Sequence, residues 1–142
     1  MNAPRHRLRL RVLVVDDEPT VRRYFRRLLA RLVESVEEAS DGQEALERIK
    51  SAHSDERLDL VLSDLSMPHL NGIELARQLY ALETKPPIVL VTAYDPPELE
   101  PLLTAGLVAG VLPKPTPLAI LRAELERHLP DASGRASSDA AP

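Results

Sequence analysis

The chain has 142 residues and a 44% share of hydrophobic residues, enough for one globular domain with a substantial core, and its formal net charge is −4. It has no cysteine, which excludes disulfides, thiolate metal ligands and cysteine nucleophiles. Tryptophan is absent and only three tyrosines and one phenylalanine are present, so the core must be aliphatic, and a surface that stacks nucleobases is not expected.

The first predicted elements are a strand and a helix. Residues 1–8 have no periodicity and are expected to form a flexible N-terminus. Residues 10–15 predict a short buried strand, whose apolar run is too short for a signal peptide or a membrane span, so a cytoplasmic location is expected. The strand ends in Asp16 and Asp17, and a proline that suits a first helical turn begins a helix over residues 19–32.

This first helix is predicted to be amphipathic, with arginines opposite an apolar face. The apolar face comprises Val21, Tyr24, Phe25, Leu28, Leu29 and Leu32. Residues 1–31 hold nine arginines and three acidic residues, a local charge of +6, which leaves −10 for the rest of the chain. A basic face of this kind suits nucleic acid or an acidic protein, but no nucleic-acid motif accompanies it, so a solvated helix face is the simpler interpretation.

The middle of the chain predicts two more strand–helix pairs. A short strand over residues 35–39 leads through an Asp-Gly turn to a helix that ends in the polar stretch 50–57. A buried strand is then predicted to begin at Leu60, and one carboxylate, Asp64, lies at its carboxyl end. A helix over residues 73–82 follows, and its predicted apolar side consists of Ile73, Ala76, Leu79 and Tyr80.

The last third of the chain predicts two strands and two helices. The apolar residues 88–92 form the fourth strand, and Pro101 keeps the next helix short or bent. Residues 110–114 form a clipped fifth strand. The final helix covers residues 117–129, with its leucines inward: Leu118, Leu121, Leu125 and Leu129.

Residues 130–142 have no apolar period and are predicted to be a disordered tail. One domain over residues 9–129 is therefore expected. No DNA-binding or catalytic module follows it, so we expect a single-domain protein.

Five apolar strands that alternate with five helices predict an α/β fold: a doubly wound, flavodoxin-like, five-stranded parallel sheet with helices on both faces. In such sheets ligands bind outside the carboxyl ends of the strands. The polar residues predicted at those ends are Asp16, Asp17, Asp64, Thr92 and Lys114.

Three carboxylates, a hydroxyl and an ammonium at one sheet edge make a candidate phosphoryl-transfer site. Neighbouring carboxylates repel one another unless a cation lies between them, so the cluster predicts a divalent metal. Oxygen ligands alone favour Mg²⁺ or Mn²⁺ over Zn²⁺. The metal and the ammonium would neutralise phosphoryl oxygens while a carboxylate attacks in line.

The ordered motifs resemble the receiver domain of two-component response regulators, in particular the single-domain chemotaxis-regulator type. The resemblance covers about residues 8–129. Its segments are Val-Leu-Val-Val-Asp16-Asp17-Glu-Pro, Leu-Val-Leu-Ser-Asp64-Leu-Ser-Met67-Pro68 with Gly72 following, Val-Leu-Val-Thr92-Ala93, and Lys114-Pro115.

This resemblance implies a role for each motif residue. Asp64 would accept a phosphoryl group from a phosphohistidine of a histidine kinase or histidine phosphotransfer protein. Asp17, Asp64 and the backbone carbonyl of Ser66 would bind Mg²⁺ directly, and Asp16 would act through a bound water. Lys114 would pair with the phosphoryl group.

The resemblance also implies a switch. Thr92 would move to hydrogen-bond the phosphoryl group and so alter the face around the fourth helix and fifth strand, where an unknown downstream protein would bind. The domain would assist only its own phosphorylation and dephosphorylation, with no direct nucleic-acid contact and no membrane insertion. The Lys114–Pro115 bond is expected to be cis, and the first-helix arginines Arg22, Arg23 and Arg26 are expected to dock the phosphodonor.

Two departures from the family pattern concern this switch. Val111 stands where the family usually has an aromatic residue that swings inward on activation. Tyr94, two residues after Thr92, is expected instead to shield the phosphoryl group from water. The prolines between Pro96 and Pro117 predict a small conformational change across that surface.

Other function classes fit less well. An aspartate-nucleophile phosphohydrolase of the haloacid dehalogenase type needs a second aspartate two residues after the nucleophile, where this chain has Ser66. A flavodoxin-like binding module needs a phosphate-cradling loop after the first strand, which here carries negative charge. A pseudo-receiver that is not phosphorylated stays open, although all five expected polar residues are present.

Overall fold

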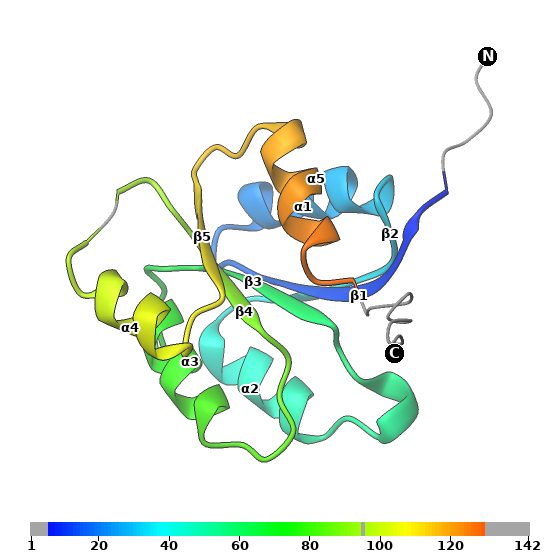
Figure 1. Cartoon of the computed structure of the whole chain (residues 1–142). Helices are drawn as coiled ribbons and strands as arrows, with labels where there is room; N and C mark the ends of the chain where they lie inside the picture. The colour runs from blue at the N-terminus through cyan, green and yellow to red at the C-terminus, as the bar shows by residue number, and fades with distance from the viewer. Residues whose placement is uncertain (1–5, 95, 130–142) are drawn as a thin grey trace, which may run out of the picture.

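Five parallel strands form one sheet in the order β2-β1-β3-β4-β5, and helices connect the strands (Figure 1). The computed structural model describes residues 6–94 and 96–129. The strands are β1 (Leu8–Val15), β2 (Val33–Ala39), β3 (Leu60–Asp64), β4 (Ile88–Thr92) and β5 (Gly110–Pro113). The helices are α1 (Pro19–Ala30), α2 (Gly42–Lys50), the 3₁₀ turn η1 (Ser54–Glu56), α3 (Gly72–Tyr80), α4 (Leu99–Ala105) and α5 (Leu118–Glu126). The predicted doubly wound α/β fold is confirmed.

The sheet is buried on both faces, as its uninterrupted apolar strands predicted. Helices α1 and α5 cover one face, and α2, α3 and α4 cover the other (Figure 1). Successive residues of β1 alternate between the two cores, with Leu13 on the α2–α3–α4 side and Val12 and Val14 on the α1–α5 side. The interior of the sheet is therefore mainly aliphatic, and the buried Ser63 of β3, next to Asp64, is one of its few polar side chains.

Strand order reverses beside β1, and this reversal creates the crevice in which such folds bind ligands. The registers bring the carboxyl ends of the central strands level. Val15 pairs with Ser63, and Asp64 pairs with Val91 on β4. Thr92 in turn pairs with Pro113 on β5. Residues that follow these strands therefore start from one edge of the sheet.

Most predicted elements are confirmed, with small shifts at their ends. β1 begins two residues before the predicted strand, because Leu8 already pairs with Val33. α1 ends at Ala30 rather than at residue 32, β4 has the predicted bounds, and α4 is short, at seven residues. The predicted tail, residues 130–142, and most of the predicted flexible N-terminus lie outside the described residues.

Three predicted core residues are wrong, since Tyr24, Tyr80 and Leu118 are all exposed. Tyr24 lies beside the buried Phe25, which takes the inward position on α1 and meets the tyrosine ring edge to face. Tyr80 ends α3 and lies beneath the Lys85 ammonium, 5.3 Å from the ring centroid. Leu118 is the first residue of α5, one turn before the first buried leucine of that helix.

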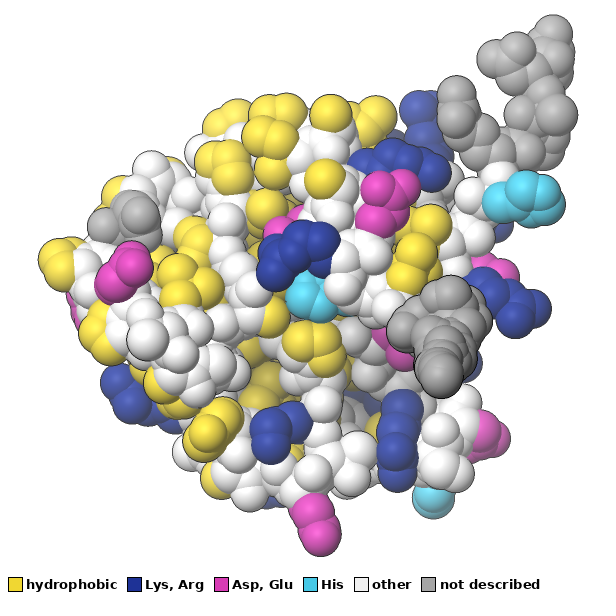
Figure 2. Space-filling model, in the orientation of Figure 1, with side chains coloured by type: hydrophobic (Ala, Val, Ile, Leu, Met, Phe, Trp, Pro, Cys, Tyr) yellow, Lys and Arg dark blue, Asp and Glu magenta, His cyan; other side chains and the backbone are white. Residues whose placement is uncertain are grey.

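One face of the molecule is rich in apolar side chains. Figure 2 shows them gathered over α4, β5 and α5. Helix α5 itself carries two exposed apolar residues, Leu118 and Ile120. No helix within residues 6–94 and 96–129 is long and apolar enough to cross a membrane.

Candidate functional site

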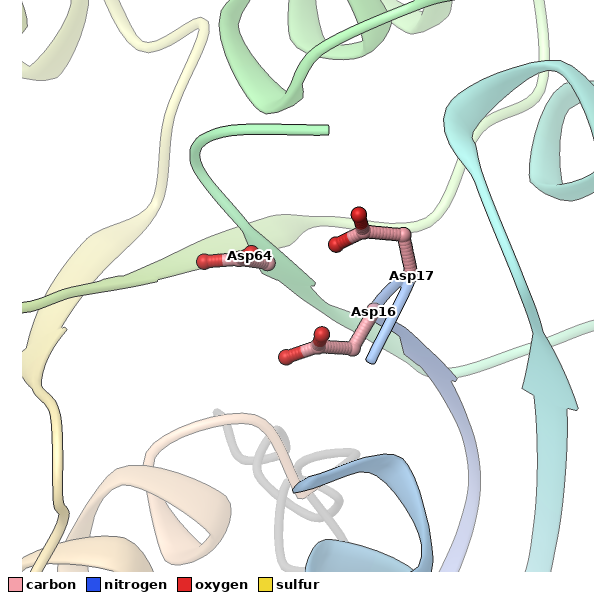
Figure 3. A group of neighbouring side chains, drawn as sticks. All are labelled: Asp16, Asp17 and Asp64. Atoms are coloured by element: carbon pink, nitrogen blue, oxygen red, sulfur yellow. The ribbon is translucent and has the colours of Figure 1, made fainter. Parts of the chain in front are cut away.

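Three carboxylates meet at the carboxyl edge of the sheet (Figure 3). Asp16 and Asp17 follow the last residue of β1, and Asp64 is the last residue of β3. One oxygen from each of the three side chains lies within 4.8 Å of the other two. The direct pairing of β1 with β3 produces this proximity, because it sets the two strand ends side by side.

Lys114 completes this group from the end of β5. Its Nζ lies 3.0 Å from Asp64 Oδ1 and 3.3 Å from Asp16 Oδ2. The Asp16 and Asp64 side chains are only 5% and 12% exposed, so both ion pairs are shielded from bulk water. The Lys114–Pro115 peptide bond is cis, as expected.

The charges in this group do not balance, since three carboxylates face one ammonium. Burial raises the pKa of the Asp64 carboxyl, and the neighbouring Asp16 charge raises it further, while Lys114 opposes both effects. Burial alone would lower the pKa of the Lys114 ammonium, but the hydrogen bond to Asp64 and the charges of Asp16 and Asp64 outweigh it, so its pKa is raised. A divalent cation on oxygen ligands fits the remaining negative charge.

The two neighbouring aspartates of the β1–α1 loop differ in their bonding. Asp16 Oδ1 accepts a hydrogen bond from the Glu18 N–H at 2.9 Å, and its Oδ2 faces Lys114. The exposed Asp17 side chain makes no hydrogen bond or ion pair with any residue that the structure describes. Asp17 is therefore the carboxylate more open to direct metal ligation, and the occupied oxygens of Asp16 suit action through a water.

Close packing of α3 fixes the loop that follows Asp64. A Cβ on Gly72 would lie 2.6 Å from the Asp64 carbonyl oxygen, so only glycine fits without a shift. The Gly72 N–H donates to the Leu65 carbonyl at 2.9 Å, and Asn71 begins α3 in a capping box with Glu74. Ser66, the predicted carbonyl ligand, lies in this loop and is exposed.

Thr92, Tyr94 and Val111 lie outside the acidic group. Thr92 is buried, and its Oγ1 accepts a hydrogen bond from the Tyr94 N–H at 3.2 Å. The Tyr94 side chain is 60% exposed. Val111 packs against the core on the α2–α3–α4 side of the sheet. Within the described residues no hydrogen bond joins Thr92 to the carboxylates or to Lys114.

One contact of the site was missed by sequence reasoning, which placed the α1 arginines in solvent or on a docking surface. Arg22 Nη1 donates to the Asp16 carbonyl at 2.7 Å, and its Nε pairs with Glu38 Oε1 at 2.9 Å. Arg26 also pairs with Glu38. The available signal was the Glu-Glu pair in the predicted second strand, because a charged pair in a half-buried strand needs partners.

The model of the response regulator receiver domain matches residues 12–126. The chain belongs to this family. It is 43% identical over 129 residues to the response regulator MprA of Mycolicibacterium vanbaalenii, an alignment that covers 86% of this chain and 53% of the relative. The chain thus spans about half the length of the curated relatives it matches.

Solved structures show the same fold. The chemotaxis protein CheY4 of Vibrio cholerae is 32% identical with a TM-score of 0.69, and the match covers 85% of this chain and 99% of that one. The receiver domain of the putative response regulator NarL of Mycobacterium tuberculosis is 30% identical with a TM-score of 0.73, covering 84% and 95%. Receivers are typically phosphorylatable signalling domains rather than true enzymes, and a receiver implies a cognate histidine kinase.

Proposed function

We propose that Asp64 accepts a phosphoryl group from a phosphohistidine of a histidine kinase or histidine phosphotransfer protein, in a Mg²⁺- or Mn²⁺-dependent reaction. The observation that carries this proposal is the position of the Asp64 carboxylate, 3.0 Å from the Lys114 ammonium and beside two further carboxylates. The family match supports it, and we propose the cytoplasm as its location.

The proposed transfer needs one nucleophile and one cationic partner from this chain. An Asp64 oxygen attacks the phosphorus in line, the new O–P bond forms, and the P–N bond to the donor histidine breaks. The imidazole leaves with its electron pair and takes a proton from water. The raised pKa of the Lys114 ammonium keeps it charged, so it can follow the transferred oxygens.

Oxygen ligands for the metal would come from Asp17, Asp64 and the Ser66 carbonyl, with Asp16 acting through water. Bound there, Mg²⁺ would offset the charge of the phosphoryl oxygens. The fit rests on the donor set, which is all oxygen and carries more negative charge than Lys114 balances.

Thr92 is the proposed relay to the surface. Its Oγ1 accepts the Tyr94 N–H, so a Thr92 side chain that turns toward the phosphoryl group must release this bond. The loop after β4 would then rearrange and alter the apolar face over α4, β5 and α5, which we propose as the contact surface for an unidentified downstream protein.

The proposed docking surface for the phosphodonor differs from the one expected from the sequence. Arg22 and Arg26 are tied to Glu38, whereas Arg23, Arg27 and Arg31 form no ion pair within the described residues. These three residues recur every fourth position, Arg23 and Arg27 within α1 and Arg31 as its C-cap, a spacing at which like charges repel one another unless acidic groups approach. We therefore propose this row as the basic contact.

The test is incubation of the full chain with acetyl phosphate and Mg²⁺, followed by intact mass measurement. We expect the mass increase of one phosphoryl group, its loss on treatment with hydroxylamine, and its absence in Asp64→Asn. Asp59→Asn, at the opposite end of β3, is the matched control and should be labelled like the wild type. Labelling of Asp64→Asn would refute the assignment, and a wild type that stays unlabelled would favour the pseudo-receiver.

A further inference from the structure

Arg22 is partly buried, unlike the other arginines of α1. Its side chain is 18% exposed, although it belongs to a helix whose other arginines are exposed. The guanidinium bonds in two directions: Nη1 donates to the Asp16 carbonyl oxygen at 2.7 Å, and Nε pairs with Glu38 Oε1 at 2.9 Å. These two contacts of the Arg22 guanidinium link α1, the edge strand β2 and the loop that carries Asp16 and Asp17.

The bond to Asp16 completes the partners of that residue. The Asp16 N–H donates to the Ala39 carbonyl at 3.2 Å, and its two carboxylate oxygens face the Glu18 N–H and Lys114. Within the described residues, Arg22 is the hydrogen-bond partner of the Asp16 carbonyl, so removal of the Arg22 side chain would leave this carbonyl without a partner there. Asp16 is thus held at each polar atom.

This carbonyl also determines the orientation of Asp17. The carbonyl of Asp16 and the N–H of Asp17 belong to one planar peptide unit, so a hydrogen bond to the first fixes the tilt of the second. The Asp17 side chain has no bond of its own within the described residues. Its direction therefore depends on the backbone that Arg22 holds.

We propose that Arg22 is a positioning residue for the cation site: through the Asp16 carbonyl, it holds the Asp17 carboxylate where Mg²⁺ can bind. This inference rests on the proposed function, because it assumes that the acidic group binds Mg²⁺. Residues that orient metal ligands without touching the metal typically contribute about 10- to 100-fold to metal affinity. Glu38 supports the arrangement by fixing the guanidinium from the other side.

Arg26 provides a matched control. It lies one turn further along α1 and pairs with the same carboxylate, Glu38, at 2.9 Å, but within the described residues no hydrogen bond joins it to Asp16. Arg26→Ala and Arg22→Ala therefore each remove one guanidinium from Glu38, and only Arg22→Ala releases the Asp16 carbonyl. A purely structural tie between α1 and β2 predicts similar effects for both variants.

The experiment measures Mg²⁺ affinity of the full chain by calorimetric titration, with the melting temperature of each variant recorded alongside. We expect Arg22→Ala to bind Mg²⁺ about tenfold more weakly, and Arg26→Ala to stay within about twofold of the wild type. Arg22→Lys should recover part of the loss, because one ammonium can replace one of the two bonds. In phosphorylation by acetyl phosphate, Arg22→Ala should need more Mg²⁺ for half-maximal rate but approach the wild-type rate at saturating Mg²⁺.

The outcomes separate this inference from the proposed function. Equal Mg²⁺ affinities of Arg22→Ala and Arg26→Ala, in a wild type that binds Mg²⁺, would overturn the role of Arg22 alone. A wild type that binds no Mg²⁺ would overturn the proposed function and this inference together. If Arg22→Ala does not fold, the comparison of Arg22→Met with Arg26→Met decides, because methionine keeps much of the aliphatic stem without a hydrogen-bond donor, and equal affinities there refute the inference.

Discussion

Because the carboxylate of Asp17 is unpaired within the described residues, we predict that repulsion in the acidic group destabilises the metal-free protein. Asp17 faces Asp16 and Asp64 with side-chain oxygens within 4.8 Å and receives no hydrogen bond or ion pair within the described residues. Two like charges 4.8 Å apart repel by about 0.9 kcal/mol in water, and salt reduces this value. With two such neighbours, Asp17→Asn should increase the free energy of unfolding by about 1 kcal/mol at neutral pH.

The assay is urea unfolding in EDTA at low ionic strength, repeated with saturating Mg²⁺. In Mg²⁺ the wild type should become more stable than Asp17→Asn. A ligand present at 100 times its Kd stabilises the wild type by about 2.7 kcal/mol, and the variant should lose most of this gain. Glu83→Gln, an exposed loop carboxylate, is the control and should change neither value. An Asp17→Asn variant that is less stable than the wild type in EDTA would refute the repulsion argument.

Three further predictions follow from other parts of the fold. Gly72→Ala should lower the free energy of unfolding by about 1–3 kcal/mol in urea melts and slow phosphorylation by acetyl phosphate, because its Cβ would press on the Asp64 carbonyl; a variant as stable and active as the wild type would contradict the packing. The hydrogen bond from Arg48 holds the pKa of Glu37 below its usual value. The contribution of this ion pair to the free energy of unfolding is therefore present at neutral pH and is lost as pH falls through the folded-state pKa of Glu37. Glu37→Gln should therefore cost about 1 kcal/mol at pH 7 and progressively less in acid, and a pH-independent difference would be inconsistent with this ion pair. Tyr94→Ala should shorten the half-life of the aspartyl phosphate, measured by loss of label after the donor is removed, and an unchanged half-life would show that Tyr94 does not shield it.

The parts of the fold that sequence predicted well are those decided by continuous burial. Strands covered on both faces must be apolar throughout, and β4 was located with its observed bounds for that reason. The acidic group was also predictable, because parallel strands bring their carboxyl ends to one edge, and Asp16, Asp17 and Asp64 each follow or end a buried run. Their grouping needed no knowledge of side-chain positions.

The parts that sequence missed depend on which elements become neighbours. A helical period identifies the centre of a buried face but not its borders or ends, so Tyr24 at a border and Leu118 at an end were placed inward by mistake. The two-way bonding of Arg22 requires α1 to lie beside β2, which a charge pattern along α1 does not contain. The unequal bonding of Asp16 and Asp17 likewise appears only when the ammonium of Lys114 and the loop backbone are in place.

Direct chemical mapping can show whether Asp64 itself carries the phosphoryl group. Phosphoramidate, a small donor with the same P–N bond as phosphohistidine, can label the full chain in the presence of Mg²⁺. Borohydride then reduces an aspartyl phosphate to homoserine, which peptide mapping locates in the sequence. We expect homoserine at position 64, dependent on Mg²⁺ and lost after pretreatment with hydroxylamine. Homoserine at another aspartate, or none at position 64 under saturating donor and Mg²⁺, would contradict it.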